Sequence, residues 1–174
     1  MTLLFLLLTL LQPPPSPPET ARVLEAARAT MKAASNCFLI TLDDSGQPQA
    51  RLMAPFDPDP AMNVWLATNR KTRKVEQIRR NPRATLAYHD AVGLGYVTLI
   101  GKARLVDDLA ERRRRWKPEW KDFYPGGPED ADYLLIQFTT ERIEVMSIGR
   151  HVADAPQGWQ PAILVRQGSG WRQP

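Results

Sequence analysis

The residues with the clearest chemical potential lie together at Thr72, Arg73 and Lys74, where a predicted strand gives way to a predicted helix. Thr72 is a favourable N-cap residue, and its hydroxyl is expected to accept a hydrogen bond from a first-turn backbone N–H. Arg73 and Lys74 would follow in that turn, where the helix dipole disfavours cations by about 0.3–1 kcal/mol each. An anion resolves this conflict, because free N–H groups, a hydroxyl and two cations suit a phosphate monoester. The alternative is a basic helix start whose side chains point into solvent.

No other segment carries a strong catalytic or metal-binding pattern. The sequence has no Gly-rich nucleotide-binding loop and no nucleophile elbow. Cys37, the only cysteine, lies in an apolar stretch that is typical of an inert buried thiol. His89 and His151 are the only histidines, and each is expected at the surface. We therefore predict no catalytic side chain and no metal site.

Composition narrows the class of protein. The chain has 174 residues, 43% of them hydrophobic and 24% charged, with a formal net charge of +4. This length suits one domain, and a single cysteine excludes a disulfide framework or a Cys-rich zinc site. The arginine-rich stretches 70–83 and 112–115 leave nucleic-acid binding open as a further class of function, although a solvated helix face explains 112–115 more simply. The modest net charge does not require nucleic acid, and we predict no such partner.

The N-terminal stretch Leu3–Leu11 is apolar apart from Thr9, and a Pro-rich stretch ending at Pro18 follows it. The pattern resembles the hydrophobic region of a secretory signal peptide, although it has no preceding Lys or Arg and no A-x-A cleavage site. We expect export to the periplasm if residues 1–12 act as a signal, and a cytoplasmic protein otherwise. No apolar run is long enough to span a bilayer. We divide the chain into an apolar and Pro-rich segment (1–18), a folded domain (19–148) and a C-terminal extension (149–174).

The elements that must position Thr72 and its neighbours are mostly short strands joined by tight turns. Apolar spacing and turn residues predict helices at 19–34, 72–80, 107–117 and 118–124. They predict strands at 36–43, 49–54, 62–68, 83–89, 95–106, 133–139, 142–147 and 161–165, with a loose end at 168–170. Gly101 is expected to form a bulge or a bend. Short connections favour antiparallel pairing, so we predict a mainly β fold with inserted helices and a small antiparallel barrel.

The segments 38–51, 64–86, 95–106 and 116–128 make the chain similar to a known family. They resemble the pyridoxamine 5'-phosphate-oxidase-like family of FMN-binding split β-barrels, and within it the general-stress-protein branch. The likeness runs from about Thr30 to Val145. Its most specific part is the strand ending at Thr68, followed by Thr72-Arg73-Lys74 at a helix start.

The resemblance implies a cofactor and the residues that hold it. In that family the Thr/Ser-Arg-Lys unit binds the FMN phosphate. This is the position at which the charges of Arg73 and Lys74 also favour an anion. Thr68 would close the same pocket from the strand end. Arg51, with the backbone of Leu52 and Met53, would lie along the flavin ring edge or the ribityl chain. The resemblance also implies a homodimer with FMN bound across the subunit interface. The residues implied to bind the cofactor are Arg51, Leu52, Met53, Thr68, Thr72, Arg73 and Lys74.

Two departures from the family pattern bear on activity. Pyridoxamine-phosphate oxidases have a lysine five positions after the arginine that matches Arg51, and here that position is Phe56. Their flavin-contacting glutamine appears as Tyr96. Pyridoxamine phosphate oxidation is therefore not expected. We predict an FMN-binding oxidoreductase with an unassigned small-molecule redox substrate, with deazaflavin F420 as the alternative cofactor and haem as a remoter one. The other hypothesis is a non-catalytic flavin-binding or redox-sensing stress protein.

Overall fold

The computed structural model describes residues 19–153 and 160–174, so the predictions made for the N-terminal segment 1–18 lie outside the described residues. The α-helices are α1 (Glu19–Ala34), α2 (Arg73–Arg80) and α3 (Leu109–Arg114). Three short 3-10 turns are η1 (Pro118–Trp120), η2 (Gly127–Glu129) and η3 (Ile148–Arg150). The strands are β1 (Cys37–Leu42), β2 (Pro48–Met53), β3 (Val64–Asn69), β4 (Arg83–Asp90), β5 (Gly95–Val106), β6 (Tyr133–Ser147), β7 (Ala162–Gln167) and β8 (Gly170–Arg172).

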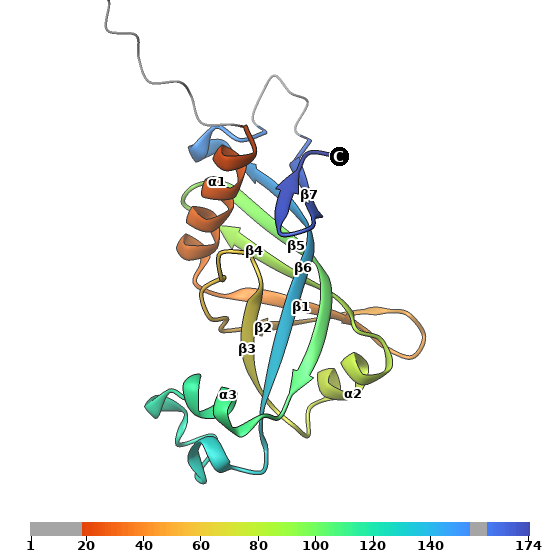
Figure 1. The fold of residues 1–174 in the computed structure, drawn as a ribbon, viewed down its shortest axis with the longest axis vertical. Helices are drawn as coiled ribbons and strands as arrows, with labels where there is room; N and C mark the ends of the chain where they lie inside the picture. The colour runs from red at the N-terminus through yellow and green to blue at the C-terminus, as the bar shows by residue number, and fades with distance from the viewer. Residues whose placement is uncertain (1–18, 154–159) are drawn as a thin grey trace, which may run out of the picture.

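All of these strands belong to one antiparallel sheet in the order β2-β1-β4-β5-β6-β7-β8, and β3 pairs with β6 as well (Figure 1). Strand β6 pairs with β5 along one edge. On its other edge it pairs with β3 through its first half and with β7 through its second half. Among the described residues, no strand pairing joins β2 to β3, and only the isolated bridge between Pro55 and Leu66 links the segment after β2 to β3, so the sheet curls without fully closing. The prediction of a mainly β, antiparallel fold with inserted helices is confirmed.

The core follows directly from the alternation of apolar and polar residues along each strand. A row of fully buried residues crosses five strands in register, each member paired with the next on the neighbouring strand. The row is Leu39, Leu86, Leu99, Ile143 and Leu164. Helix α1 contributes Val23, Ala27 and Met31 to the same core. Helix α1 thus packs on the inward face of the sheet, against β4, β5 and β6.

The two strands predicted at 133–139 and 142–147 are one continuous strand, β6, and that prediction was wrong. The register between β5 and β6 shifts between Ile100 and Gly101, which pair with Arg142 and Thr140, so Glu141 has no partner. This is a β-bulge, which bends a strand without ending it. Gly101 was predicted as the bulge position, and the close approach explains the residue type: a Cβ on Gly101 would lie 2.0 Å from the Thr139 carbonyl oxygen.

Other boundaries also differ from the prediction. The helix predicted at 107–117 is only the short α3, whose N-cap Asp108 accepts a hydrogen bond from the Glu111 backbone N–H at 2.9 Å. The helix predicted at 118–124 is the single turn η1. The loose end predicted at 168–170 is the turn between β7 and β8, with Gly168 at φ +58°. The C-terminal extension therefore adds two strands to the sheet. None of the described helices is long and apolar enough to cross a membrane.

Candidate functional site

The predicted anion site lies where β3 ends and α2 begins. Thr68 is almost fully buried near the end of β3, and Thr72 takes the N-cap position of α2 with φ −83° and ψ 147°. The N-cap position was predicted correctly, but the predicted capping hydrogen bond was wrong. The Thr72 hydroxyl instead donates to the Asn69 carbonyl oxygen at 2.8 Å. None of the first-turn N–H groups of α2 therefore donates to the Thr72 hydroxyl, and that oxygen stays available to other donors. The Val75 N–H donates to the Thr72 carbonyl oxygen at 3.0 Å.

Two hydroxyls and an ammonium group converge at this junction. The hydroxyl oxygens of Thr68 and Thr72 are 3.3 Å apart. Lys74 folds back toward the helix start, and its Nζ donates to the Thr72 hydroxyl oxygen at 3.1 Å. Lys74 is therefore half-buried over the N-terminus of α2 and does not extend into solvent. Arg73, in contrast, is exposed.

Arg51 reaches the same region from β2. It pairs with Leu39 of β1 and shares its inward face. Its Nη1 donates to the Thr41 hydroxyl at 2.5 Å, and its Nη2 donates to Oε1 of the buried Gln77 on α2 at 2.8 Å. The Thr41 hydroxyl donates to the same Gln77 oxygen at 2.6 Å. This network fixes the Arg51 guanidinium between β1 and α2.

The side chains of Arg51, Arg73 and Lys74 lie close enough together for their charges to interact. Burial and then the charge of Arg51 lower the pKa of Lys74. Burial and then the charge of Arg73 lower the pKa of Arg51. Across the described ranges, none of the three forms an ion pair with a carboxylate, and Glu76 on the same helix pairs with Arg79 instead. The site concentrates positive charge without a protein anion to balance it.

The two remaining predicted residues, Leu52 and Met53, alternate in direction along β2. Met53 is half-buried and packs against the core. The Leu52 side chain points to the opposite face from Arg51, where it is 62% exposed and lies opposite Phe38, which is 47% exposed. Its side chain therefore does not enter the site, and only its backbone can take part. Phe38 and Leu52 form an apolar patch on the outer face of the sheet, called here the outer-face patch.

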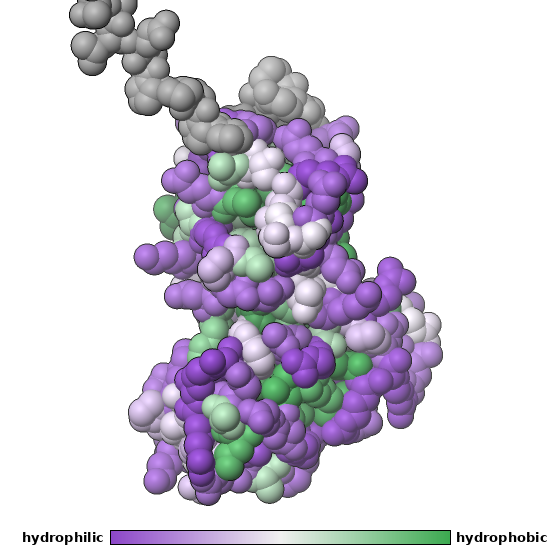
Figure 2. Space-filling view, in the orientation of Figure 1, coloured by the Kyte–Doolittle hydropathy of each residue, from purple (hydrophilic) through white to green (hydrophobic). Residues whose placement is uncertain are grey.

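Next to the anion site is a cavity of about 270 Å³ lined by Ala54, Ala67, Asn69, Trp120, Phe123 and Tyr124. Trp120 packs edge-on against Phe56 with ring centroids 5.8 Å apart, and against Trp116 at 6.1 Å. Phe123 is 74% exposed at the cavity rim. Trp116, Trp120 and Tyr124 each also pack against the Tyr133 ring. In the orientation of Figure 2, the surface is mainly hydrophilic, with its largest hydrophobic area between α2 and α3.

The site residues that sequence reasoning missed are Thr41, Gln77 and Asn69. Thr41 is a fully buried polar residue at an inward position of β1, and Gln77 is buried on the inner side of α2. Thr41 and Gln77 could have been found in the sequence, because each is a polar residue at a position where the pattern predicts a buried apolar one. A buried polar group needs a hydrogen-bond partner.

The remaining reactive residue types have no catalytic arrangement. Burial raises the pKa of the Cys37 thiol to about 12, so the prediction of an inert buried cysteine is confirmed. His89 and His151 are exposed as predicted. The described residues contain no group of three or more His, Cys, Asp and Glu side chains that could hold a metal ion.

The second arginine cluster, 112–115, is not simply a solvated helix face. Arg112 is buried and pairs with Asp107 at 3.1 Å. Arg113 pairs with Glu129, and Glu111 pairs with Arg114 and Arg115. These carboxylates balance much of the positive charge of this cluster.

An unclosed antiparallel sheet with a cluster of basic side chains at a strand–helix junction is the arrangement expected of a split-barrel protein. The sequence matches the family described as "Pyridoxamine 5'-phosphate oxidase like" over residues 23–153. The chain belongs to this family. The predicted split-barrel fold and the predicted family are therefore both confirmed. No curated protein matches the sequence.

Solved structures with the same fold come from several bacteria. A protein from Clostridium acetobutylicum related to general stress protein 26 of Bacillus subtilis is 24% identical, with a TM-score of 0.66 over 75% of this chain and 91% of that one. A pyridoxamine 5'-phosphate oxidase-related, FMN-binding protein from Nostoc punctiforme is 16% identical, with a TM-score of 0.64 over 88% and 92% of the two chains. A heme-binding protein from Mycobacterium smegmatis is 20% identical, with a TM-score of 0.57 over 75% and 55%.

Proposed function

We propose that this protein binds FMN, with the phosphate held by Thr68, Thr72, Arg73 and Lys74. The observation that carries the proposal is a group of three cations, Arg51 from β2 with Arg73 and Lys74 at the start of α2. The pKa values of Arg51 and Lys74 are lowered, and none of the three is paired with a carboxylate in the described part of the chain. A phosphate dianion would relieve this repulsion and accept charge-assisted hydrogen bonds worth about 1.5–3 kcal/mol each. The residues present therefore fit a phosphate ester.

The neighbouring cavity supports a planar ring attached to that phosphate. Asn69 lines the cavity and lies between Thr68 and Thr72, so the two sites adjoin. Trp120 and Phe123 offer aromatic surface to a flat ligand. Arg51 and the backbone of Leu52 and Met53 approach from β2. When bound, FMN would supply hydride or electron transfer, and the protein would bind and orient it.

We propose a homodimer with the cofactor at the subunit interface. Support comes from the outer-face patch, in which Phe38 and Leu52 lie side by side on neighbouring strands and are largely exposed. Paired apolar side chains at a sheet face are typical of surfaces that a partner covers. Leu52 stands on the outer face while Arg51, next to it, reaches the anion site, so one short strand contributes to both surfaces.

The reaction we propose is flavin-dependent oxidation or reduction of a small molecule, without a catalytic side chain. The second candidate is non-catalytic binding of a flavin, of F420 or of haem, or redox sensing. Phe56 favours this candidate, because it occupies the position of the oxidase lysine and packs against Trp120 with Lys117 Nζ 5.0 Å from its ring centroid. The structural neighbours of this chain include one described as FMN-binding and one described as heme-binding.

The test is the absorbance spectrum of the purified protein, followed by anaerobic reduction with nicotinamide nucleotides. Flavin bands that are reduced within seconds support the oxidoreductase. Flavin bands that are not reduced support non-catalytic binding. The variant Arg73→Gln/Lys74→Gln should lose the flavin. The matched control Arg79→Gln/Arg80→Gln removes the same charge from the other end of α2, where both arginines pair with acids, and should keep it. Equal retention by the two variants would refute the phosphate site.

A further inference from the structure

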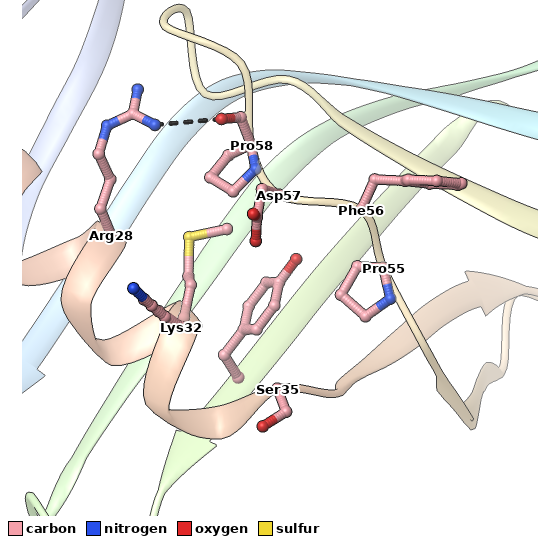
Figure 3. A pocket seen from close by; sticks show the side chains of 9 residues that line it. Arg28, Lys32, Ser35, Pro55, Phe56, Asp57 and Pro58 are labelled. Carbon is pink, nitrogen blue, oxygen red and sulfur yellow. Dashed lines mark hydrogen bonds between the residues drawn. The ribbon is translucent and has the colours of Figure 1, made fainter. Parts of the chain in front are cut away.

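A second cavity, of about 410 Å³, lies between the C-terminal half of α1 and the segment 55–58 (Figure 3). It is lined by Arg28, Met31, Lys32, Ser35, Pro55, Phe56, Asp57, Pro58 and Tyr88. None of the residues proposed to hold the FMN phosphate lines it. The volume is within the range of cavities that hold small organic ligands.

The wall opposite α1 is held open by hydrogen bonds. Arg28 Nη1 donates to the Pro58 carbonyl oxygen at 3.2 Å, as drawn in Figure 3. Its Nη2 donates to the carbonyl oxygens of Asp59 at 2.8 Å and Pro60 at 2.9 Å. The Phe56 N–H donates to the Trp65 carbonyl oxygen at 2.9 Å. These bonds tie the segment 56–60 to α1 and β3, so the cavity is part of the built structure.

Tyr88 provides a buried hydroxyl without a partner. The residue is only 2% exposed, and its hydroxyl forms no hydrogen bond with any described residue. The neighbouring Cys37 thiol is in contact with this hydroxyl, and a thiol is only a weak hydrogen-bonding partner. Burial raises the pKa of Tyr88, and Cys37 and then Asp57 raise it further, so the hydroxyl keeps its proton. A buried donor of this kind is normally matched by a ligand or a water.

Two opposite charges flank the cavity without neutralising each other. Lys32 extends from α1, and Asp57 stands on the facing segment (Figure 3). Neither side chain forms an ion pair within the part of the chain that the structure describes. Between them lie the apolar surfaces of Met31, Pro55 and Phe56. A ligand that carries both charges and an apolar body would match all of these groups at once.

We propose that this cavity binds a small zwitterion of the α-amino-acid type with an apolar side chain. Its carboxylate accepts from Lys32 and from the Tyr88 hydroxyl, its ammonium group donates to Asp57, and its side chain packs on Met31, Pro55 and Phe56. No covalent step is involved. The proposal is independent of the flavin site, which uses other residues.

The test is titration calorimetry of the full chain with L-phenylalanine and two analogues that each lack one charge. 3-Phenylpropionate lacks the ammonium group and 2-phenylethylamine lacks the carboxylate. We expect L-phenylalanine to bind at least roughly tenfold more tightly than either analogue. Comparable binding of all three probes, or no binding of L-phenylalanine at millimolar concentration, would overturn the proposal.

Variants of the two exposed charges make the test specific. Asp57→Asn should abolish the preference for L-phenylalanine over 3-phenylpropionate, and Lys32→Met should abolish the preference over 2-phenylethylamine. Lys121→Met, which changes an exposed lysine outside the cavity, should change neither. Tyr88→Phe should weaken the binding of L-phenylalanine and 3-phenylpropionate, which carry a carboxylate, and leave the binding of 2-phenylethylamine unchanged. Unchanged preferences in Asp57→Asn and Lys32→Met would refute the assignment, since neither exposed residue is needed for folding.

Discussion

Replacing Lys74 by methionine should stabilise the flavin-free protein and at the same time weaken its binding of FMN. The ammonium group of Lys74 is half-buried close to Arg51, and both burial and that neighbouring charge lower its pKa. Methionine keeps an unbranched side chain and removes the charge. The two effects have opposite signs because the same charge opposes folding and favours the ligand.

The magnitudes follow from ordinary contributions. Removing an unfavourable charge at such a site is worth about 0.5–1 kcal/mol, which for a chain of this size raises the melting temperature by roughly 1–4 °C. Losing one charge-assisted hydrogen bond to phosphate costs about 1.5–3 kcal/mol, or roughly 10- to 150-fold in the dissociation constant. Since the folded-state pKa of Lys74 lies below its ordinary value of 10.5, the folded protein binds this proton less tightly than the unfolded chain. The stability gain of the variant is therefore largest near neutral pH and fades as the pH approaches 10.5.

The assay combines thermal unfolding of the flavin-free protein, followed by circular dichroism, with calorimetric titration of FMN. Lys71→Met is the matched control, because Lys71 is exposed and its hydrogen bond to Asp132 at 2.8 Å raises its pKa. The control should show no stability gain and a change in FMN affinity below about threefold. A Lys74→Met variant that melts earlier than wild type and binds FMN normally would refute the reasoning.

Three further predictions concern the supports of the site. Gln77→Leu removes the acceptor shared by Thr41 and Arg51. It should weaken FMN binding by roughly 3- to 10-fold in a titration and lower the free energy of unfolding in urea by about 1–3 kcal/mol. Wild-type values for both quantities would contradict the positioning role of Gln77. Phe38→Asp should convert the proposed dimer into a monomer in light scattering after gel filtration, and a variant that stays dimeric would exclude the outer-face patch. Gly101→Ala forces a methyl group against a backbone oxygen 2.0 Å away. It should lower the free energy of unfolding in urea by about 1–3 kcal/mol or more. An unchanged free energy of unfolding would mean that the bulge can relax.

Most strands, the bulge and the basic cluster could be predicted from short stretches of the sequence. Alternation predicted most strands, a glycine in a long apolar strand predicted the bulge, and the sequence Thr72-Arg73-Lys74 predicted the basic cluster at the start of α2. The continuity of β6 could not be predicted in this way. The polar pair Thr140 and Glu141 reads as an interruption, and only the register with β5 shows that Glu141 is the extra residue of a bulge.

The contacts that fix Arg51 are also beyond local patterns. They join residues 10, 26 and 36 positions apart in the chain, from β1, β2 and α2. Their geometry depends on how α2 packs against the sheet, which no spacing rule specifies. The Thr72 hydroxyl is a similar case, since the residue takes the predicted position but donates to Asn69 instead of capping the helix.

The most direct test of the central proposal compares the affinities of FMN and riboflavin, which differ only in the phosphate group. If Thr72, Arg73 and Lys74 grip that phosphate, wild-type protein should bind FMN at least roughly a hundredfold more tightly than riboflavin. In Arg73→Gln/Lys74→Gln, this ratio should fall to within a few-fold of unity. Equal affinities of the wild-type protein for the two compounds would contradict the account.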